Sequence, residues 1–302
     1  YAFTSATLVR SVPLIIIGLG IALAFRGGAF NIGAEGQFYA GAIAATWVGL
    51  HVGGLPAPVA IAALLLAAGL AGAAWVAVPV VLKRRFGVLE VISTLLLNFV
   101  AESLVSLMVQ GPLQESRHIY PQSDPIADAA RLPLLPGTRL HGGIVLALAG
   151  AGALFVLFKY TRWGFRLRAV GAGPRAAEVS GLIDAGRMTA GALLLSGAIA
   201  GVAGGVEVSG VSYALYQNLS PGYGFTAIAV ALLARLDPRG VVATGVLFGA
   251  LEAGAGAMQR DAGVPAVAVY VVEAVVIVAV LLADAYRRGA ALPERRPMES
   301  GA

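Results

Sequence analysis

The sequence predicts an all-α polytopic membrane protein. Of its 302 residues, 58% are hydrophobic and only 12% are charged, whereas a soluble domain carries roughly 25% charged residues. The apolar residues form long segments, and most of the basic residues fall in the connections on one side of those segments. These three features together indicate about nine transmembrane helices.

The nine apolar segments are each long enough, or nearly so, to cross a bilayer, which takes roughly 17–25 helical residues. The 40 glycines and the many alanines suit such helices, because small residues let helix backbones approach closely. The first and seventh segments are short, so broken or half-buried helices are expected there. In chain order the predicted segments are 11–25, 33–50, 57–82, 89–110, 142–158, 188–208, 222–236, 240–258 and 264–284.

The basic residues predict the orientation. If the loop of Lys83, Arg84 and Arg85 is cytoplasmic and the segments alternate from there, 16 of the 21 Lys and Arg lie inside and five lie outside. Such an imbalance follows the positive-inside rule. It places the N-terminus outside and the C-terminus in the cytoplasm, so a chain that starts in the cytoplasm would need one more span upstream. The net charge of +5 is small and spread over these loops, which makes nucleic acid a poor candidate partner.

A transmembrane domain is expected over residues 1–288 and a cytoplasmic tail over 289–302. Two long loops interrupt the transmembrane domain. The loop 111–141, rich in Pro, Asp and Ser, is expected outside, either as a partner surface or as a plain solvated connection. The loop 159–187 is expected inside and carries six basic residues. Within it a Gly-Pro break precedes a run of helix formers from Pro174 to Ser180, and Gly181 stands where a helix would stop. That loop is either an ordinary basic connection or a segment through which another protein pushes on the membrane domain.

The sequence suggests an internal repeat. In each of two places a glycine-containing motif precedes a span, a Pro turn and a second span; the motifs are FNIG at 30–33 and PGYGF at 221–225. The predicted orientation places the first Pro turn outside and the second inside. The two units would therefore have inverted topology, which is common in transporters.

Polar residues in apolar segments form two clusters. Asn31, Glu35 and Gln37 stand among glycines at the start of a span, as in a broken helix that exposes hydrogen-bonding groups. Thr94, Asn98 and Glu102 are spaced i, i+4, i+8 and share one helix face. Such residues either line a solute path or bond neighbouring helices. Four aromatic residues near the outer end of a span are most simply an interfacial belt: Tyr213, Tyr216, Tyr223 and Phe225.

Several classes of chemistry find no support. The chain has no cysteine, which excludes disulfides and thiolate catalysis. It contains no phosphate-binding GxxxxGK[ST] motif and no nucleophile elbow. The three histidines, His51, His118 and His141, fall at or in outer loops without metal-ligand spacing. The sequence therefore indicates a transport protein that is not itself an enzyme and binds no cofactor.

Four ordered motifs resemble those of a known family. They are FNIGAEGQF at 30–38, LEVISTLLLNF at 89–99, RLRAVGAGPRAAEVSGL at 166–182 and GYGFTAIAVALLARLDPRG at 222–240. Together they resemble the permease subunits of bacterial ABC importers of the branched-chain amino acid and simple-sugar class, and most of all the nucleoside-importing branch. Simple sugars and branched-chain amino acids remain alternative solutes.

The resemblance implies a multi-pass protein of the bacterial cytoplasmic membrane. It implies two permeases, identical or paralogous, two cytoplasmic ATPase subunits that use the ATP, and an external substrate-binding lipoprotein. It also implies that the loop 166–182 contains the coupling helix that docks on the ATPase. The residues expected to have this role are Gly171, Arg175, Ala176, Ala177, Glu178 and Gly181. We expect the two polar clusters to line the path. An ion-coupled secondary transporter that uses Glu35 or Glu102 is the alternative from another class.

Overall fold

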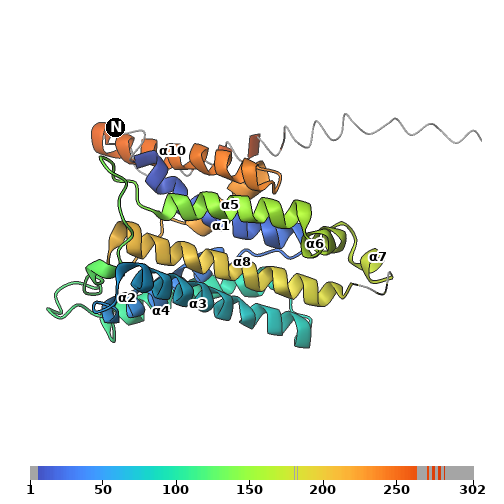
Figure 1. The fold of residues 1–302 in the computed structure, drawn as a ribbon, viewed down its shortest axis with the longest axis horizontal. Coiled ribbons are helices and arrows are strands. Elements are labelled where there is room, and N and C mark those ends of the chain that lie inside the picture. Colours follow the sequence, from blue (N-terminus) through green and yellow to red (C-terminus); the bar gives the residue numbers. More distant parts are fainter. Residues whose placement is uncertain are drawn as a thin grey trace, which may run out of the picture. The chain divides into compact units, whose positions relative to one another are not determined.

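The computed structural model describes residues 6–179, 181 and 183–263, together with six isolated positions between 271 and 282. The chain divides into two compact units, Tyr1–Ala253 and Gly254–Ala302. Within the described ranges the protein is helical and shows no β-strand, only two isolated β-bridges. Figure 1 labels the helices, which are α1 (Leu8–Arg26), α2 (Ala34–His51), α3 (Ala57–Phe86), α4 (Glu90–Gln110), α5 (Gly143–Tyr160), α6 (Arg162–Ala172), α7 (Pro174–Val179), α8 (Ala185–Glu207), α9 (Tyr223–Leu233) and α10 (Pro238–Ala262), with the short turns η2 (Asp128–Ala130) and the π-helix η3 (Val208–Ser212).

The helix lengths confirm the predicted class. Six helices in the described part are long and apolar enough to cross a membrane: α1, α3, α4, α5, α8 with its π-helical extension, and α10. The more polar α2 has 18 residues. The expectation of a short first helix is wrong, because α1 has 19 residues, whereas the seventh predicted segment is indeed short, since α9 has 11 residues. The ninth predicted segment and the tail lie, apart from those isolated positions, outside the described residues.

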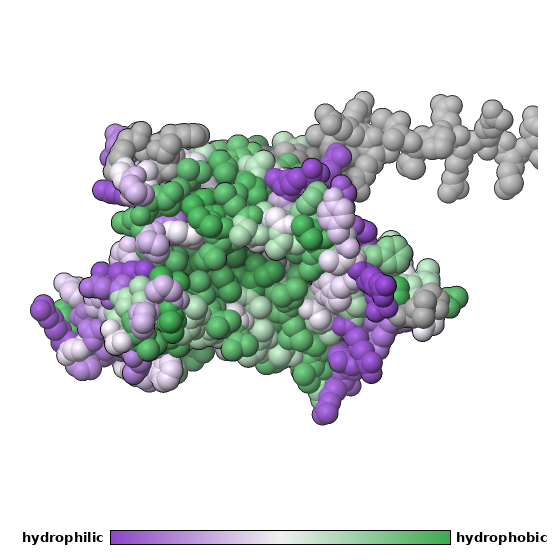
Figure 2. All heavy atoms as spheres, in the orientation of Figure 1, coloured by the Kyte–Doolittle hydropathy of each residue, from purple (hydrophilic) through white to green (hydrophobic). Residues whose placement is uncertain are grey.

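Apolar side chains cover much of the outer surface. Leu70 on α3, Phe99 on α4 and Val145 on α5 are all more than half exposed. The middle of the face seen in Figure 2 is apolar, and polar residues gather towards its two ends. An apolar band of this kind would be costly in water, and it is the surface that a lipid bilayer covers.

Helix α8 packs against α1, α2 and α3 through backbone contacts at glycines. A Cβ atom on Gly41 would collide with the backbone of Gly201, and one on Gly204 with the carbonyl oxygen of Phe38. Gly72 of α3 meets Gly197 of α8 in the same way. These contacts confirm the prediction that small residues bring the helices together, which in a membrane is a main source of packing energy.

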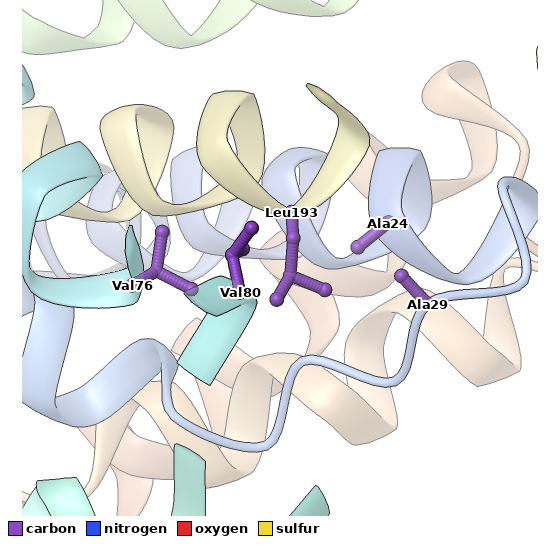
Figure 3. Packing of buried hydrophobic residues seen from close by; sticks show 5 residues of the cluster. All are labelled: Ala24, Ala29, Val76, Val80 and Leu193. Atoms are coloured by element: carbon purple, nitrogen blue, oxygen red, sulfur yellow. The ribbon is translucent and has the colours of Figure 1, made fainter. Parts of the chain in front are cut away.

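At the end of the bundle that carries α6 and α7, larger side chains close the packing. Leu193 of α8 lies between Val76 and Val80 of α3 on one side and Ala24 and Ala29 on the other (Figure 3). Ala29 already belongs to the non-helical segment that follows α1. The cluster therefore fixes the start of the segment that leads to the polar residues described next.

Candidate functional site

The segment Ala29–Gly33 between α1 and α2 is non-helical, and Ala29, Asn31 and Gly33 are buried, whereas Phe30 is 52% exposed. Asn31 is fully buried, and its Nδ2 donates to Gln37 Oε1 at 2.8 Å and to Ser196 Oγ at 2.9 Å. Gln37 Nε2 donates back to Asn31 Oδ1 at 2.8 Å. Ser196 lies about halfway along α8. The hydrogen bonds of Asn31 therefore join the start of α2 to the middle of the bundle.

Helix α4 holds the same segment from the other side. Asn98 Nδ2 donates to the Ile32 carbonyl at 3.0 Å, and its Oδ1 accepts from the Gly36 N–H at 2.8 Å. Thr94 Oγ1 accepts from the Ile32 N–H at 3.3 Å. The predicted stripe of α4 therefore divides: Thr94 and Asn98 face this segment, whereas Glu102 is exposed.

Glu35 links two helix starts. Its Oε2 accepts a hydrogen bond of 2.5 Å from the backbone N–H of Gly224, in the first turn of α9. A carboxylate is favourable at this position, because helix N-termini carry unpaired N–H groups and a partial positive charge. This contact joins the helix start that follows the first motif of the suggested repeat, at Glu35, to the second motif, at Gly224.

This arrangement, which we call the polar junction, comprises Asn31, Glu35, Gln37, Thr94, Asn98, Ser196 and Gly224. It confirms the expected break before α2. Non-helical backbone at membrane depth is tolerated where protein surrounds it or where it lines a cavity, and here side chains satisfy it. Ser196 and Gly224 were missed from the sequence, because a single serine in an apolar helix and a glycine in a glycine-rich motif carry no distinctive pattern.

The other predicted group lies in 159–187, where α6 and α7 follow α5. Thr161 Oγ1 caps α6 by accepting from the Gly164 N–H at 3.0 Å. The predicted short helix is confirmed as α7, and the predicted stop is also confirmed, because Gly181 has a φ of +68° and its N–H donates to Glu178 O at 2.9 Å. Of α7, Ala177 is buried against Val170 and Ala185, whereas the outward residues Arg175, Ala176 and Glu178 are exposed.

Gly171 joins α6 to the end of α1. A Cβ atom at this position would collide with the carbonyl oxygen of Arg26. The Arg26 guanidinium lies 4.6 Å from the ring centroid of Phe158, and Arg168 donates to the Phe158 carbonyl. The loop 159–187 is therefore packed on the turn that immediately precedes Ala29–Gly33.

The expected interfacial belt needs correction at one residue. Tyr223 is buried, with 5% of its surface exposed, and its ring packs edge-on against Phe38 with centroids 6.0 Å apart, so an interfacial belt does not describe it. His141 lies just before α5, as predicted, and is fully buried; its burial lowers its pKa to about 4.

The chain belongs to the family described as branched-chain amino acid transport system, permease component, whose pattern it matches over residues 3–281. It is thus a multi-pass membrane protein and the permease component of a transport system.

Named relatives agree with this assignment. The chain is 38% identical to the glucose ABC transporter permease protein TsgB13 of Haloferax volcanii, over 93% of this chain and 76% of that protein. It is 37% identical to the guanosine ABC transporter permease protein NupP of Bacillus subtilis, over 94% and 82%. It is 32% identical to the nucleoside ABC transporter permease protein NupB of Lactococcus lactis, over 88% and 75%. No solved structure matches the chain.

Proposed function

We propose that this chain is the permease of an ATP-binding cassette importer that moves nucleosides into the cytoplasm. Its similarity to the guanosine and nucleoside permeases supports the solute. A simple sugar is the second candidate, because the glucose permease of Haloferax volcanii is similar over nearly the whole chain. The partners would be two ATPase subunits, a second permease, identical or paralogous, and an external substrate-binding lipoprotein.

The observation that carries the coupling mechanism is the contact of Gly171 with Arg26. The exposed face of α7 would receive the ATPase, and α6 would pass its displacement to the turn Arg26–Gly28. This turn continues into Ala29–Gly33 and so into the polar junction. ATP binding would therefore shift a segment on which the starts of α2 and α9 depend. Only contacts that differ between two conformations can drive such a shift. The donors and acceptors of the polar junction can supply such contacts, because they can exchange hydrogen-bond partners.

We further propose that 159–187 lies in the cytoplasm and 111–141 outside. The distribution of basic residues supports this orientation. Figure 1 shows the two regions at opposite ends of the first unit. ATPase and lipoprotein would thus bind to opposite ends of the same helices.

A secondary transporter driven by an ion gradient has less support. Glu35 is held by Gly224 at a helix start, which favours a structural role for its charge. Glu102, the other candidate carrier, is exposed on α4.

The test is affinity purification of the tagged chain from its native membrane, followed by uptake in proteoliposomes. We expect a P-loop ATPase and a permease pair in stoichiometric yield, and uptake of labelled guanosine that requires ATP and the lipoprotein. Labelled glucose serves as the competing solute. Uptake by the chain alone, driven by a proton or sodium gradient without ATP, would overturn the proposal.

A further inference from the structure

A cavity of about 600 Å³ opens at the end of the first unit that carries loop 111–141. It lies between the start of α1 and the segment from Glu207 to Tyr223. Small-molecule sites commonly have volumes of about 300–1,000 Å³. Its polar and aromatic lining consists of Arg10, Arg139, Glu207, Tyr213, Tyr216, Asn218 and Tyr223. We call it the tyrosine cavity.

Glu207 is the unusual group in this cavity. It is the last residue of α8, only 5% of its surface is exposed, and its carboxylate accepts no hydrogen bond from the residues described. A buried carboxylate is costly unless it is hydrogen-bonded. Arg10 also lines the cavity, but its guanidinium lies 3.7 Å from a carboxylate oxygen of Glu252. Glu207 therefore has acceptor capacity directed at the cavity.

The backbone around the cavity is irregular. Immediately after Glu207 the chain forms the π-helix η3, a feature often found at functional sites. Tyr213 and Asn218 both have a φ of +57°, a region that non-glycine residues seldom occupy. Backbone strain of this kind persists where the surroundings impose it, and it concentrates at binding sites.

Loop 111–141 imposes this conformation. The Ile126 N–H donates to Tyr213 O at 2.8 Å, and the Ser123 N–H donates to Leu215 O at 2.8 Å. Arg131 lies over the Tyr213 ring, 4.9 Å from its centroid. The loop thus supports the wall of the cavity and also lines it with Leu134 and Arg139, so it is no plain solvated connection.

The three tyrosines offer aromatic surface to a ring. Tyr223 is locked by its contact with Phe38, whereas Tyr216 is 38% exposed. Aromatic faces pack well on flat or ring-shaped groups, and phenol hydroxyls add hydrogen bonds. A carboxylate that receives no hydrogen bond from the protein can accept hydrogen bonds from neighbouring hydroxyl groups of a solute.

We propose that the tyrosine cavity binds the transported solute through a ring that carries neighbouring hydroxyl groups, as in ribose or a hexose. Glu207 accepts hydrogen bonds from the hydroxyl groups, and the tyrosines contact the ring. This inference rests on the proposed import function and adds a binding site within the permease. The ring can belong to a nucleoside or to a free sugar, and the experiment separates the two.

The absence of cysteine from the chain allows a direct test. The full complex is assembled with Tyr216→Cys, and the rate of its modification by a methanethiosulfonate reagent is measured with and without solute. A bound solute slows modification by 1 + [L]/Kd, about tenfold at ten times Kd. We expect this slowing with guanosine and none with sorbitol, which has hydroxyl groups but no ring; a slowing with glucose instead identifies a sugar. Tyr120→Cys is the control, because Tyr120 lies in loop 111–141, is 61% exposed and does not line the cavity.

Uptake by the same variants distinguishes a failure of the cavity proposal from a failure of the proposed import function. If a variant complex imports solute with ATP but neither guanosine nor glucose protects Tyr216→Cys, the cavity proposal is wrong while the importer stands. If the wild-type complex shows no ATP-dependent uptake, the import function itself fails. Asn218→Cys replaces Tyr216→Cys if the latter does not assemble. As a second readout, we expect Glu207→Gln to raise the KM for uptake at least tenfold at saturating lipoprotein, and an unchanged KM would also contradict the proposal.

Discussion

The carboxylate of Glu35 accepts a 2.5 Å hydrogen bond from the Gly224 N–H, although the two residues are 189 positions apart. This contact joins the first turn of α2 to the first turn of α9. Together with the ring contact between Phe38 and Tyr223, it fixes the relative position of two helix starts in the bundle. The consequences can be tested.

Replacement of Glu35 by Ala should destabilise the chain by about 1.5–3 kcal/mol, the range for a hydrogen bond to a charged group. Glu35→Gln keeps an oxygen acceptor and should retain most of the stability and of the ATP-driven uptake. Thermal unfolding of the purified protein and uptake in proteoliposomes check both. Loss of uptake in Glu35→Gln with full stability would favour a proton-carrying role instead.

Gly201→Ala should be strongly destabilising. A Cβ at this position would collide with the Ala68 carbonyl oxygen and lie 2.9 Å from the Gly72 Cα, and overpacking of this kind typically costs about 1–3 kcal/mol. Gly191→Ala on the same helix is the control, because nothing lies within 4 Å of its added Cβ. The control should be neutral or stabilising, since Ala is the better helix former. Equal melting temperatures for the two variants would contradict the packing described for α8.

Gly171→Val should uncouple ATP hydrolysis from transport. Its side chain would push α6 away from the Arg26 carbonyl, while the exposed face of α7 stays available to the ATPase. Gly173→Ala is the matched control, since its Cβ would meet only Ala176 at an ordinary 3.7 Å. The measured quantity is the number of ATP molecules hydrolysed per solute imported, which should rise severalfold only for Gly171→Val. A similar ratio in both variants would argue against the proposed lever.

Acid should destabilise the fold through His141. Burial lowers the pKa of His141 to about 4 from the usual 6.5, so between these values the unfolded chain binds a proton that the folded chain does not. Stability should therefore fall as the pH drops below about 6.5, by up to about 1.4 kcal/mol per pH unit. The melting temperature should depend less on pH between 7 and 5 in His141→Asn, which keeps an acceptor for the Gly143 N–H. Identical pH profiles would show that another group is responsible.

Single cysteines should report the orientation. Val179→Cys, at a position 87% exposed on α7, should be labelled by a membrane-impermeant reagent only after the cells are opened. Tyr120→Cys should be labelled in intact cells. The reverse pattern would invert the proposed topology.

Much of the architecture could be predicted from local patterns. The apolar segments, the short helix α7 and the stop at Gly181 each depend on a few consecutive residues, so composition and turn chemistry reveal them. The prediction for α4 was only half informative: i, i+4 spacing placed Thr94, Asn98 and Glu102 on one face, but only the first two reach the segment before α2. Spacing defines a helix face, and it does not say where along that face the neighbouring helix ends.

By itself the sequence determined the membrane class, the positions of most helices and the family, because bilayer thickness and small-residue packing leave local signatures in the chain. Only the tertiary structure decided which distant groups meet: Asn31 with Ser196, and Glu35 with Gly224. The physical reason is that a buried polar group must find a partner wherever the fold supplies one, and that partner can be nearly two hundred residues away.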